Sequence, residues 1–131
     1  MIALRLAVAL VLAFLPASAM AAPAMHVLHI TDTQAQTIAP STQLEIRLPA
    51  MLGSGFSWSM TPLAGSVLKP GQQGSMARGP NDPNLDGSPD VQFFCFTAVH
   101  AGSETLTFDY RQPFDRKAPP SKAYRVTITV K

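Results

Sequence analysis

The amino-acid sequence predicts an all-β protein, an immunoglobulin-like antiparallel β-sandwich of seven or eight short strands. Three observations lead to this fold class. Short runs of alternating apolar and polar residues recur along the chain, and strands with one buried face have this pattern. No apolar pattern of helical period continues beyond the N-terminal segment, so crossover helices for a parallel sheet are not expected. Pro, Gly, Asn and Asp separate the runs, as turns separate the strands of a sandwich.

The first 21 residues have the features of a secretory signal peptide. Arg5 precedes an unbroken apolar run over residues 6–15, and a proline and several small residues follow it. This run is too short to span a bilayer. Cleavage is expected after residues 19–21, with 17–19 as an alternative site. Residues 22–131 are then expected to form one periplasmic or secreted domain that is not anchored in a membrane.

The predicted strands follow one another along the mature chain. Apolar and charged residues alternate from Leu44 to Leu48, and similar alternation marks the last two strands. We expect Trp58, near the start of the fourth strand, to lie in the core. Residues 62–90 contain five Pro and five Gly and are predicted to be mostly loop, and a second Pro-rich connection covers 112–122. The predicted strands cover residues 26–31, 37–39, 43–48, 56–60, 67–69, 91–99, 104–111 and 123–130.

The residues that enzymes use for chemistry do not form a recognisable set in this sequence. There is no nucleophile elbow, no HExxH motif and no phosphate-binding glycine loop, so no enzymatic activity is expected. His26 and His29 would point to opposite faces of one strand, which argues against a shared copper ion. Cys95 is the only cysteine, so no intramolecular disulfide forms, and its apolar neighbours predict an inert thiol.

Charge is low overall but uneven along the chain. The net charge of +2 and the 14% of charged residues give no reason to expect nucleic-acid binding. Residues 22–110 carry three basic and seven acidic side chains, whereas residues 111–131 carry six basic and one acidic. The basic C-terminal part is either a rim that attracts an acidic partner or a set of solvated strand and loop positions.

One segment has the spacing of a calcium-binding loop. Asp82, Asn84, Asp86 and Asp90 follow the pattern of oxygen ligands, and Gly87 stands where such loops turn sharply. Position twelve is an aromatic residue rather than the usual Glu, and the same residue types also favour ordinary turns. Calcium is therefore a possible ligand, a turn-rich loop is the alternative, and no other cofactor is expected.

Several short motifs succeed one another from about residue 26 to residue 130. Their order and spacing resemble those of the chagasin-type inhibitors of papain-like cysteine proteases, whose first motif reads Leu-Pro-x-Asn-Pro-Thr-Thr-Gly-Phe-x-Trp. The later family motifs are Phe-x-Phe-x-Ala, Gly, apolar-x-Phe-x-Tyr and x-Arg-Pro-Trp-Glu. The matching segments here are Leu48-Pro49-Ala50-Met51-Leu52-Gly53-Ser54-Gly55-Phe56-Ser57-Trp58, Phe94-x-Phe96-x-Ala98, Gly102, Leu106-x-Phe108-x-Tyr110 and Arg111-Gln112-Pro113-Phe114-Asp115.

The resemblance implies a monomeric sandwich that presents three loops as a wedge and fills the active-site cleft of a papain-like cysteine protease without covalent chemistry. The protease-binding residues are carried over by position, and loop 2 is placed by counting back from Phe94 onto the family's Gly-x-Gly-Gly element. Loop 1 comprises Met51, Leu52, Gly53, Ser54, Gly55 and Phe56; loop 2 comprises Gly87, Ser88, Pro89 and Asp90; loop 3 comprises Gln112, Pro113, Phe114 and Asp115.

The loops depart from the family motifs more than the strands do. Met51-Leu52-Gly53 stands in place of Asn-Pro-Thr, Pro89-Asp90 in place of two glycines, and Phe114 in place of Trp. An alternative is therefore an immunoglobulin-like periplasmic binding module with a different protein partner and with calcium as a stabilising ligand. Both alternatives predict that Met51, Leu52 and Phe114 lie exposed at one end of the sandwich, whereas burial of Met51 and Leu52 would favour a structural role.

Overall fold

Eight strands and one 3₁₀ turn make up the part of the chain that the structure, a computed structural model, describes: residues 11–14, 24–77, 90–115 and 117–131. Within these residues, no helix has the length and apolar character needed to cross a membrane. The elements are β1 (Met25–His29), β2 (Ala35–Ile38), β3 (Gln43–Ala50), η1 (Leu52–Ser54), β4 (Ser57–Met60), β5 (Leu68–Ala77), β6 (Asp90–Ala98), β7 (Gly102–Arg111) and β8 (Lys122–Val130).

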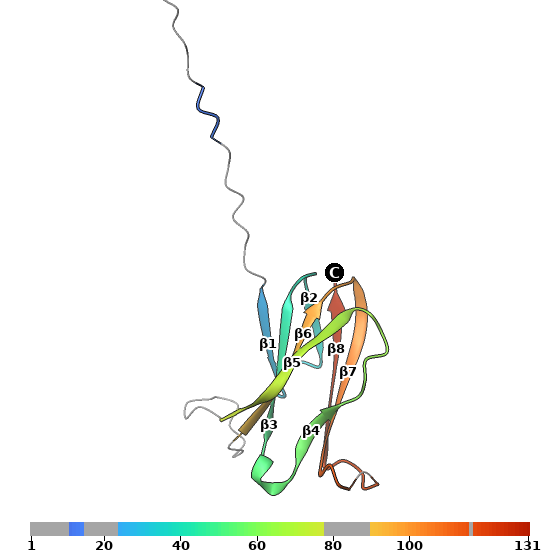
Figure 1. The fold of residues 1–131 in the computed structure, drawn as a ribbon. Coiled ribbons are helices and arrows are strands. Elements are labelled where there is room, and N and C mark those ends of the chain that lie inside the picture. Colours follow the sequence, from blue (N-terminus) through green and yellow to red (C-terminus); the bar gives the residue numbers. More distant parts are fainter. Residues whose placement is uncertain (1–10, 15–23, 78–89, 116) are drawn as a thin grey trace, which may run out of the picture.

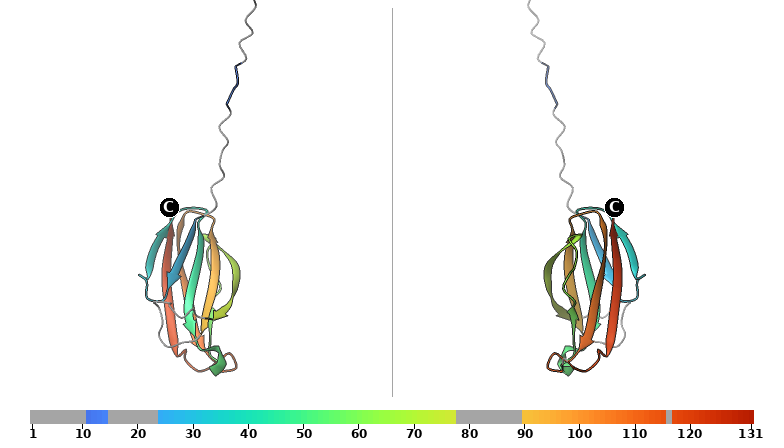
Figure 2. Two further views of the ribbon diagram at one scale, coloured as in Figure 1. Left: turned by 90° about the vertical axis from the view of Figure 1, so that its left-hand side faces the viewer. Right: turned by 90° about the vertical axis from the view of Figure 1, so that its right-hand side faces the viewer.

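The strands form two four-stranded sheets that pack face to face (Figures 1 and 2). One sheet has the order β1-β3-β6-β5 and the other β2-β8-β7-β4. This confirms the predicted all-β sandwich. Two edge strands pair in parallel, β1 with β3 and β2 with β8, whereas the sequence predicted antiparallel pairing throughout. The alternation of apolar and polar residues indicates which face of a strand is buried, but it does not indicate whether the neighbouring strand runs parallel or antiparallel.

The core lies between the sheets and is filled by alternate residues of the long strands. In β3, β7 and β8 the predicted alternation is confirmed. Trp58 is 4% exposed, as expected for a core residue. Its indole N–H donates to the Pro49 carbonyl at 2.8 Å. The side chains that are almost fully buried include Leu28, Leu44, Ile46, Leu48, Leu106, Phe108, Val126, Ile128 and Val130.

β5 corrects the prediction that residues 62–90 are mostly loop. It is a ten-residue strand that pairs with β6 through eight of its residues, and only Leu68 is buried. Pro70 is tolerated because β5 is an edge strand whose register shifts between Pro70 and Gln73. A strand exposed in this way has no apolar alternation, so the sequence pattern predicted only its start, as a strand over residues 67–69.

Cys95 lies on the outer face of β6 and is only partly buried. Burial raises the pKa of the thiol above its ordinary value, and the carboxylate of Glu45 raises it further. A thiol with a raised pKa is a weak nucleophile at neutral pH, which agrees with the predicted inert character of this cysteine.

Candidate functional site

Loops 1 and 3 lie side by side at one end of the sandwich, at the bottom of Figure 1. Loop 1 joins β3 to β4 and loop 3 begins the connection from β7 to β8. β4 and β7 are paired, with Ser57 opposite Arg111, so the two loops leave adjacent strand ends. A Cβ atom on Gly55 would lie 3.9 Å from the side chains of both Gln112 and Phe114. The structure thus brings together two of the three segments that the sequence assigned to binding.

Loop 1 is a single 3₁₀ turn closed by a left-handed glycine. The N–H of Ser54 donates to the Met51 carbonyl at 3.0 Å, and the N–H of Gly55 donates to the Leu52 carbonyl at 3.1 Å. Gly55 has φ 86°, a conformation that residues with a side chain rarely adopt. The hydroxyl of Ser54 donates to the Met51 carbonyl, so this side chain supports the loop.

Side chains of other strands anchor the start of loop 1 and the strand that follows it. The N–H of Met51 donates to the hydroxyl of Tyr110 at 3.0 Å, and the N–H of Leu52 donates to the carboxylate of Asp90 at 3.1 Å. Beyond the loop, the side-chain amide of Gln92 accepts from the N–H of Trp58 at 2.6 Å. The sequence motifs did not identify Tyr110 and Gln92 as residues that hold this region in place. Their hydrogen bonds depend on strand register and have no local sequence pattern.

Loop 3 is a tight turn with an exposed aromatic side chain. The N–H of Asp115 donates to the Gln112 carbonyl at 3.0 Å, which closes the turn. The Asp115 carboxylate then accepts from the N–H of Ala118 at 3.3 Å. Pro113 is exposed, and the side chain of Phe114 is 79% exposed. The turn therefore holds the Phe114 ring out into solvent.

The apolar tip formed by Met51 and Phe114 differs in one respect from the predicted cluster. Met51 is 46% exposed and extends the tip as expected. Leu52 is half-buried and packs against the core, as does Phe56, so neither is a fully exposed contact residue. The Phe56 ring lies 5.4 Å from the Tyr110 ring, between centroids. The exposed apolar surface of loop 1 thus consists mainly of Met51.

The second loop and the calcium hypothesis fall mostly outside the described part of the chain. Gly87, Ser88 and Pro89 of loop 2, and Asp82, Asn84 and Asp86 of the calcium pattern, lie outside it. Asp90 belongs to both sets and is described at the start of β6. Within residues 24–77, 90–115 and 117–131, no group of three or more His, Cys, Asp or Glu residues is arranged to hold a metal ion.

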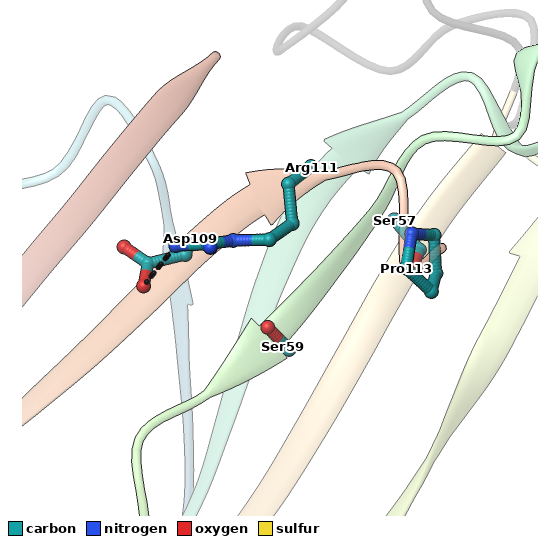
Figure 3. Close-up of a pocket in the computed structure, with 5 residues that line it drawn as sticks. All are labelled: Ser57, Ser59, Asp109, Arg111 and Pro113. Carbon is teal, nitrogen blue, oxygen red and sulfur yellow. Dashed lines mark hydrogen bonds and ion pairs between the residues drawn. The ribbon is translucent and has the colours of Figure 1, made fainter. Parts of the chain in front are cut away.

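A shallow pocket of about 370 Å³ lies beside loop 3 on the outer face of β4 and β7 (Figure 3). Arg111 extends back along β7 to Asp109, and its Nη2 lies 3.1 Å from the carboxylate oxygen of Asp109. Because the two charges compensate each other, this ion pair adds no net charge to the pocket. Ser57, Ser59 and Pro113 complete its lining.

The basic residues of the C-terminal part do not form one patch among the residues described. Lys117 and Lys122 are exposed near loop 3, and Lys122 lies 5.6 Å from the centroid of the Tyr110 ring. Arg125 is exposed further along β8, and Lys131 follows the far end of that strand. This spread favours solvated strand and loop positions over a basic rim.

The architecture of this domain is that of a small all-β sandwich, and the sequence comparison identifies its family. Residues 37–128 match the family model described as Chagasin family peptidase inhibitor I42. Because the match covers well over half of the chain, the protein belongs to the chagasin family of peptidase inhibitors. Members of this family are inhibitors of proteases and not enzymes. Comparison with curated proteins gives no significant match.

Solved structures share the fold at low sequence identity. The crystal structure of the cysteine protease inhibitor EhICP2 from Entamoeba histolytica superposes with a TM-score of 0.67 at 16% identity. That alignment covers 82% of this chain and 96% of EhICP2. The solution structure of Amebosin superposes with a TM-score of 0.56 at 22% identity, covering 84% of this chain and 100% of Amebosin. These likenesses confirm the chagasin-like fold.

Proposed function

We propose that this protein inhibits papain-like cysteine proteases by seating its loop end in their active-site cleft without forming a covalent bond. The observation that carries the proposal is the apolar tip, where Met51 and Phe114 project from two adjoining loops of a chagasin-family sandwich. The cysteine protease inhibitor EhICP2 has the same fold, which supports the proposed class of target.

The physical basis of inhibition is a rigid, exposed edge. The β-sheets and the hydrogen bonds of both turns hold the loops before binding, so docking orders few additional groups. An interface of standard size buries about 800 Å² on each partner. Large rings that enter desolvated pockets carry much of the energy of such interfaces, and Phe114 is the ring available here.

The proposal includes the site of action and the state of the protein. Residues 1–21 direct export and are removed, and the monomeric mature chain acts in the periplasm or outside the cell. The mass and N-terminal sequence of the processed protein test this step. The expected N-terminus lies near Ala22, and an unprocessed chain retained in the cytoplasm would contradict it.

The direct test of function is a steady-state titration of papain and of a cathepsin L-like protease with the purified mature chain. We expect reversible inhibition with an inhibition constant below about 1 μM, corresponding to about 8 kcal/mol of binding free energy. Titrations in calcium and in chelator show whether Asp82, Asn84, Asp86 and Asp90 contribute through a bound ion. No inhibition at tens of micromolar against either enzyme would contradict the proposal.

The second candidate is a binding module with another protein partner. It is favoured by Met51-Leu52-Gly53, which replaces the polar first motif of the family with a more apolar one. Retained fold without inhibition would support this candidate.

A further inference from the structure

We propose that Asp90 is a positioning residue for loop 1, and that its carboxylate replaces the rigidity a proline supplies at position 52 in the family motif. This inference rests on the proposed function, because it concerns the loop that enters the protease cleft. It assigns to Asp90 a role within the free protein, in addition to the contact expected from its place in loop 2.

The first step of the argument is the hydrogen bonding of the 3₁₀ turn. The first N–H groups of a helical turn have no partner within the turn and need one from elsewhere. Met51, at the N-cap of η1, makes no side-chain capping hydrogen bond. Instead, the N–H of Met51 donates to the hydroxyl of Tyr110 at 3.0 Å, and the N–H of Leu52 donates to the carboxylate of Asp90 at 3.1 Å. Two side chains from the sheets therefore cap loop 1 from outside the turn.

The second step is the strand register, which explains why Asp90 reaches loop 1. Asp90 begins β6 and pairs with Ala50, the last residue of β3. Leu52 follows two residues later, so the carboxylate stands directly beside the start of the turn. Both Asp90 and Leu52 are partly buried, and a hydrogen bond to a charged acceptor is stronger there than in open solvent.

The third step compares the two partners with the motifs quoted above. Leu52 stands at the Pro of Asn-Pro-Thr-Thr-Gly, and Asp90 stands at the last Gly of Gly-x-Gly-Gly. A proline has no N–H, so the hydrogen bond from Leu52 to Asp90 exists only because both positions differ from the motif. Met51 has φ −117° and ψ 76°, which lies outside the α region that a following proline disfavours. The two substitutions thus form a matched pair, because a hydrogen bond from Leu52 to Asp90 holds the turn that proline stiffens in the family motif.

The test uses Asp90→Ala, with Asp90→Asn as the conservative variant because it keeps an acceptor oxygen. In the free protein, we expect the Leu52 amide to exchange with solvent about tenfold faster in Asp90→Ala, and the inhibition constant to rise by a similar factor. In Asp90→Asn, both the exchange rate of the Leu52 amide and the inhibition constant should stay close to those of the unaltered protein. The matched control is Asp32→Ala, since the Asp32 carboxylate accepts the His29 N–H at 2.7 Å in the turn after β1. This control should leave Leu52 exchange and inhibition unchanged.

A double-mutant cycle tests the proposed exchange of proline for carboxylate. Leu52→Pro and Asp90→Gly should each weaken inhibition alone. The double variant should lose less binding free energy than the sum of the two single losses. The inference would be overturned if the two losses of binding free energy simply added. It would also be overturned if the Leu52 amide of Asp90→Ala exchanged with solvent at the rate of the unaltered protein. If the unaltered protein inhibits no papain-like protease, the proposed function fails, and Leu52 exchange in the free protein still decides whether Asp90 positions the loop.

Discussion

Phe114 is the most exposed large apolar side chain in the sandwich that the structure describes, at 79%. A side chain this exposed contributes little to the free energy of unfolding, because folding buries only a small part of the ring. We therefore expect Phe114→Ala to leave the thermal midpoint unchanged and to raise the inhibition constant at least about tenfold, as loss of a large hot-spot ring does. Val99→Ala is the matched control, because Val99 is 42% exposed and follows β6 at the opposite end of the sandwich. Equal inhibition by Phe114→Ala and the unaltered chain would contradict the assigned anchor.

Cys95 allows a second prediction for a single side chain, through its pKa. Burial and then the Glu45 carboxylate raise the pKa of this thiol, so the folded protein holds less thiolate at a given pH than an unfolded chain does. Iodoacetamide should therefore alkylate Cys95 more slowly in the native protein than in guanidinium at pH 8. The native rate should keep rising as the pH passes the ordinary midpoint of a cysteine. Equal rates in the two states would show that the environment does not protect the thiol.

Loop 1 is the element on which the account depends, and Tyr110 supports it together with Asp90. Tyr110→Phe removes the acceptor of the Met51 N–H but keeps the ring that packs against Trp58 and Phe56. We expect a loss of about 1 kcal/mol in unfolding free energy and a severalfold weaker inhibition. The chain's other tyrosine provides the control, because the buried hydroxyl of Tyr124 has no hydrogen-bond partner among the described residues. Tyr124→Phe should keep inhibition intact, and an equal effect of both variants would contradict a specific role for Tyr110.

Elements with one buried face could be predicted from the sequence, and exposed elements could not. β3, β7 and β8 alternate because alternate side chains enter the core, and the sequence placed them closely. β5 is exposed over nine of its ten residues, so only its start was predicted, as the strand over residues 67–69, and the rest had the composition of a loop. Loops 1 and 3 were located by motif, and the structure places Gly55 of loop 1 next to the side chains of Gln112 and Phe114 of loop 3. The support from Asp90 could not be foreseen, since it requires the pairing of Ala50 with Asp90 across two strands.

For the molecule as a whole, stability and inhibition should depend on opposite ends of the sandwich. Glu104 is buried near the start of β7, far along that strand from loop 3. Its carboxylate accepts the N–H groups of Gly65 and Leu68, each at 3.0 Å, and so fixes the connection from β4 to β5. Glu104→Ala should lower the free energy of unfolding by about 3 kcal/mol, because it leaves these N–H groups without their acceptor. Glu104→Gln keeps one acceptor oxygen and should lose less.

Urea denaturation measures this loss, and inhibition measured at a temperature where the variant stays folded provides the comparison. We expect the folded Glu104→Ala protein to inhibit with an unchanged constant. A parallel loss of inhibition would show that the loop end and the opposite end of the sandwich are coupled.

The central claim is that the loop end occupies the protease cleft. The most direct measurement is calorimetric binding of the mature chain to active papain and to papain whose cleft is filled by a covalent peptidyl inhibitor. The account predicts binding to the active enzyme, loss of most of that affinity in Phe114→Ala, and no binding to the filled enzyme. Equal affinity for the active and the filled enzyme would contradict it, because the chain would then bind papain at a surface outside the cleft.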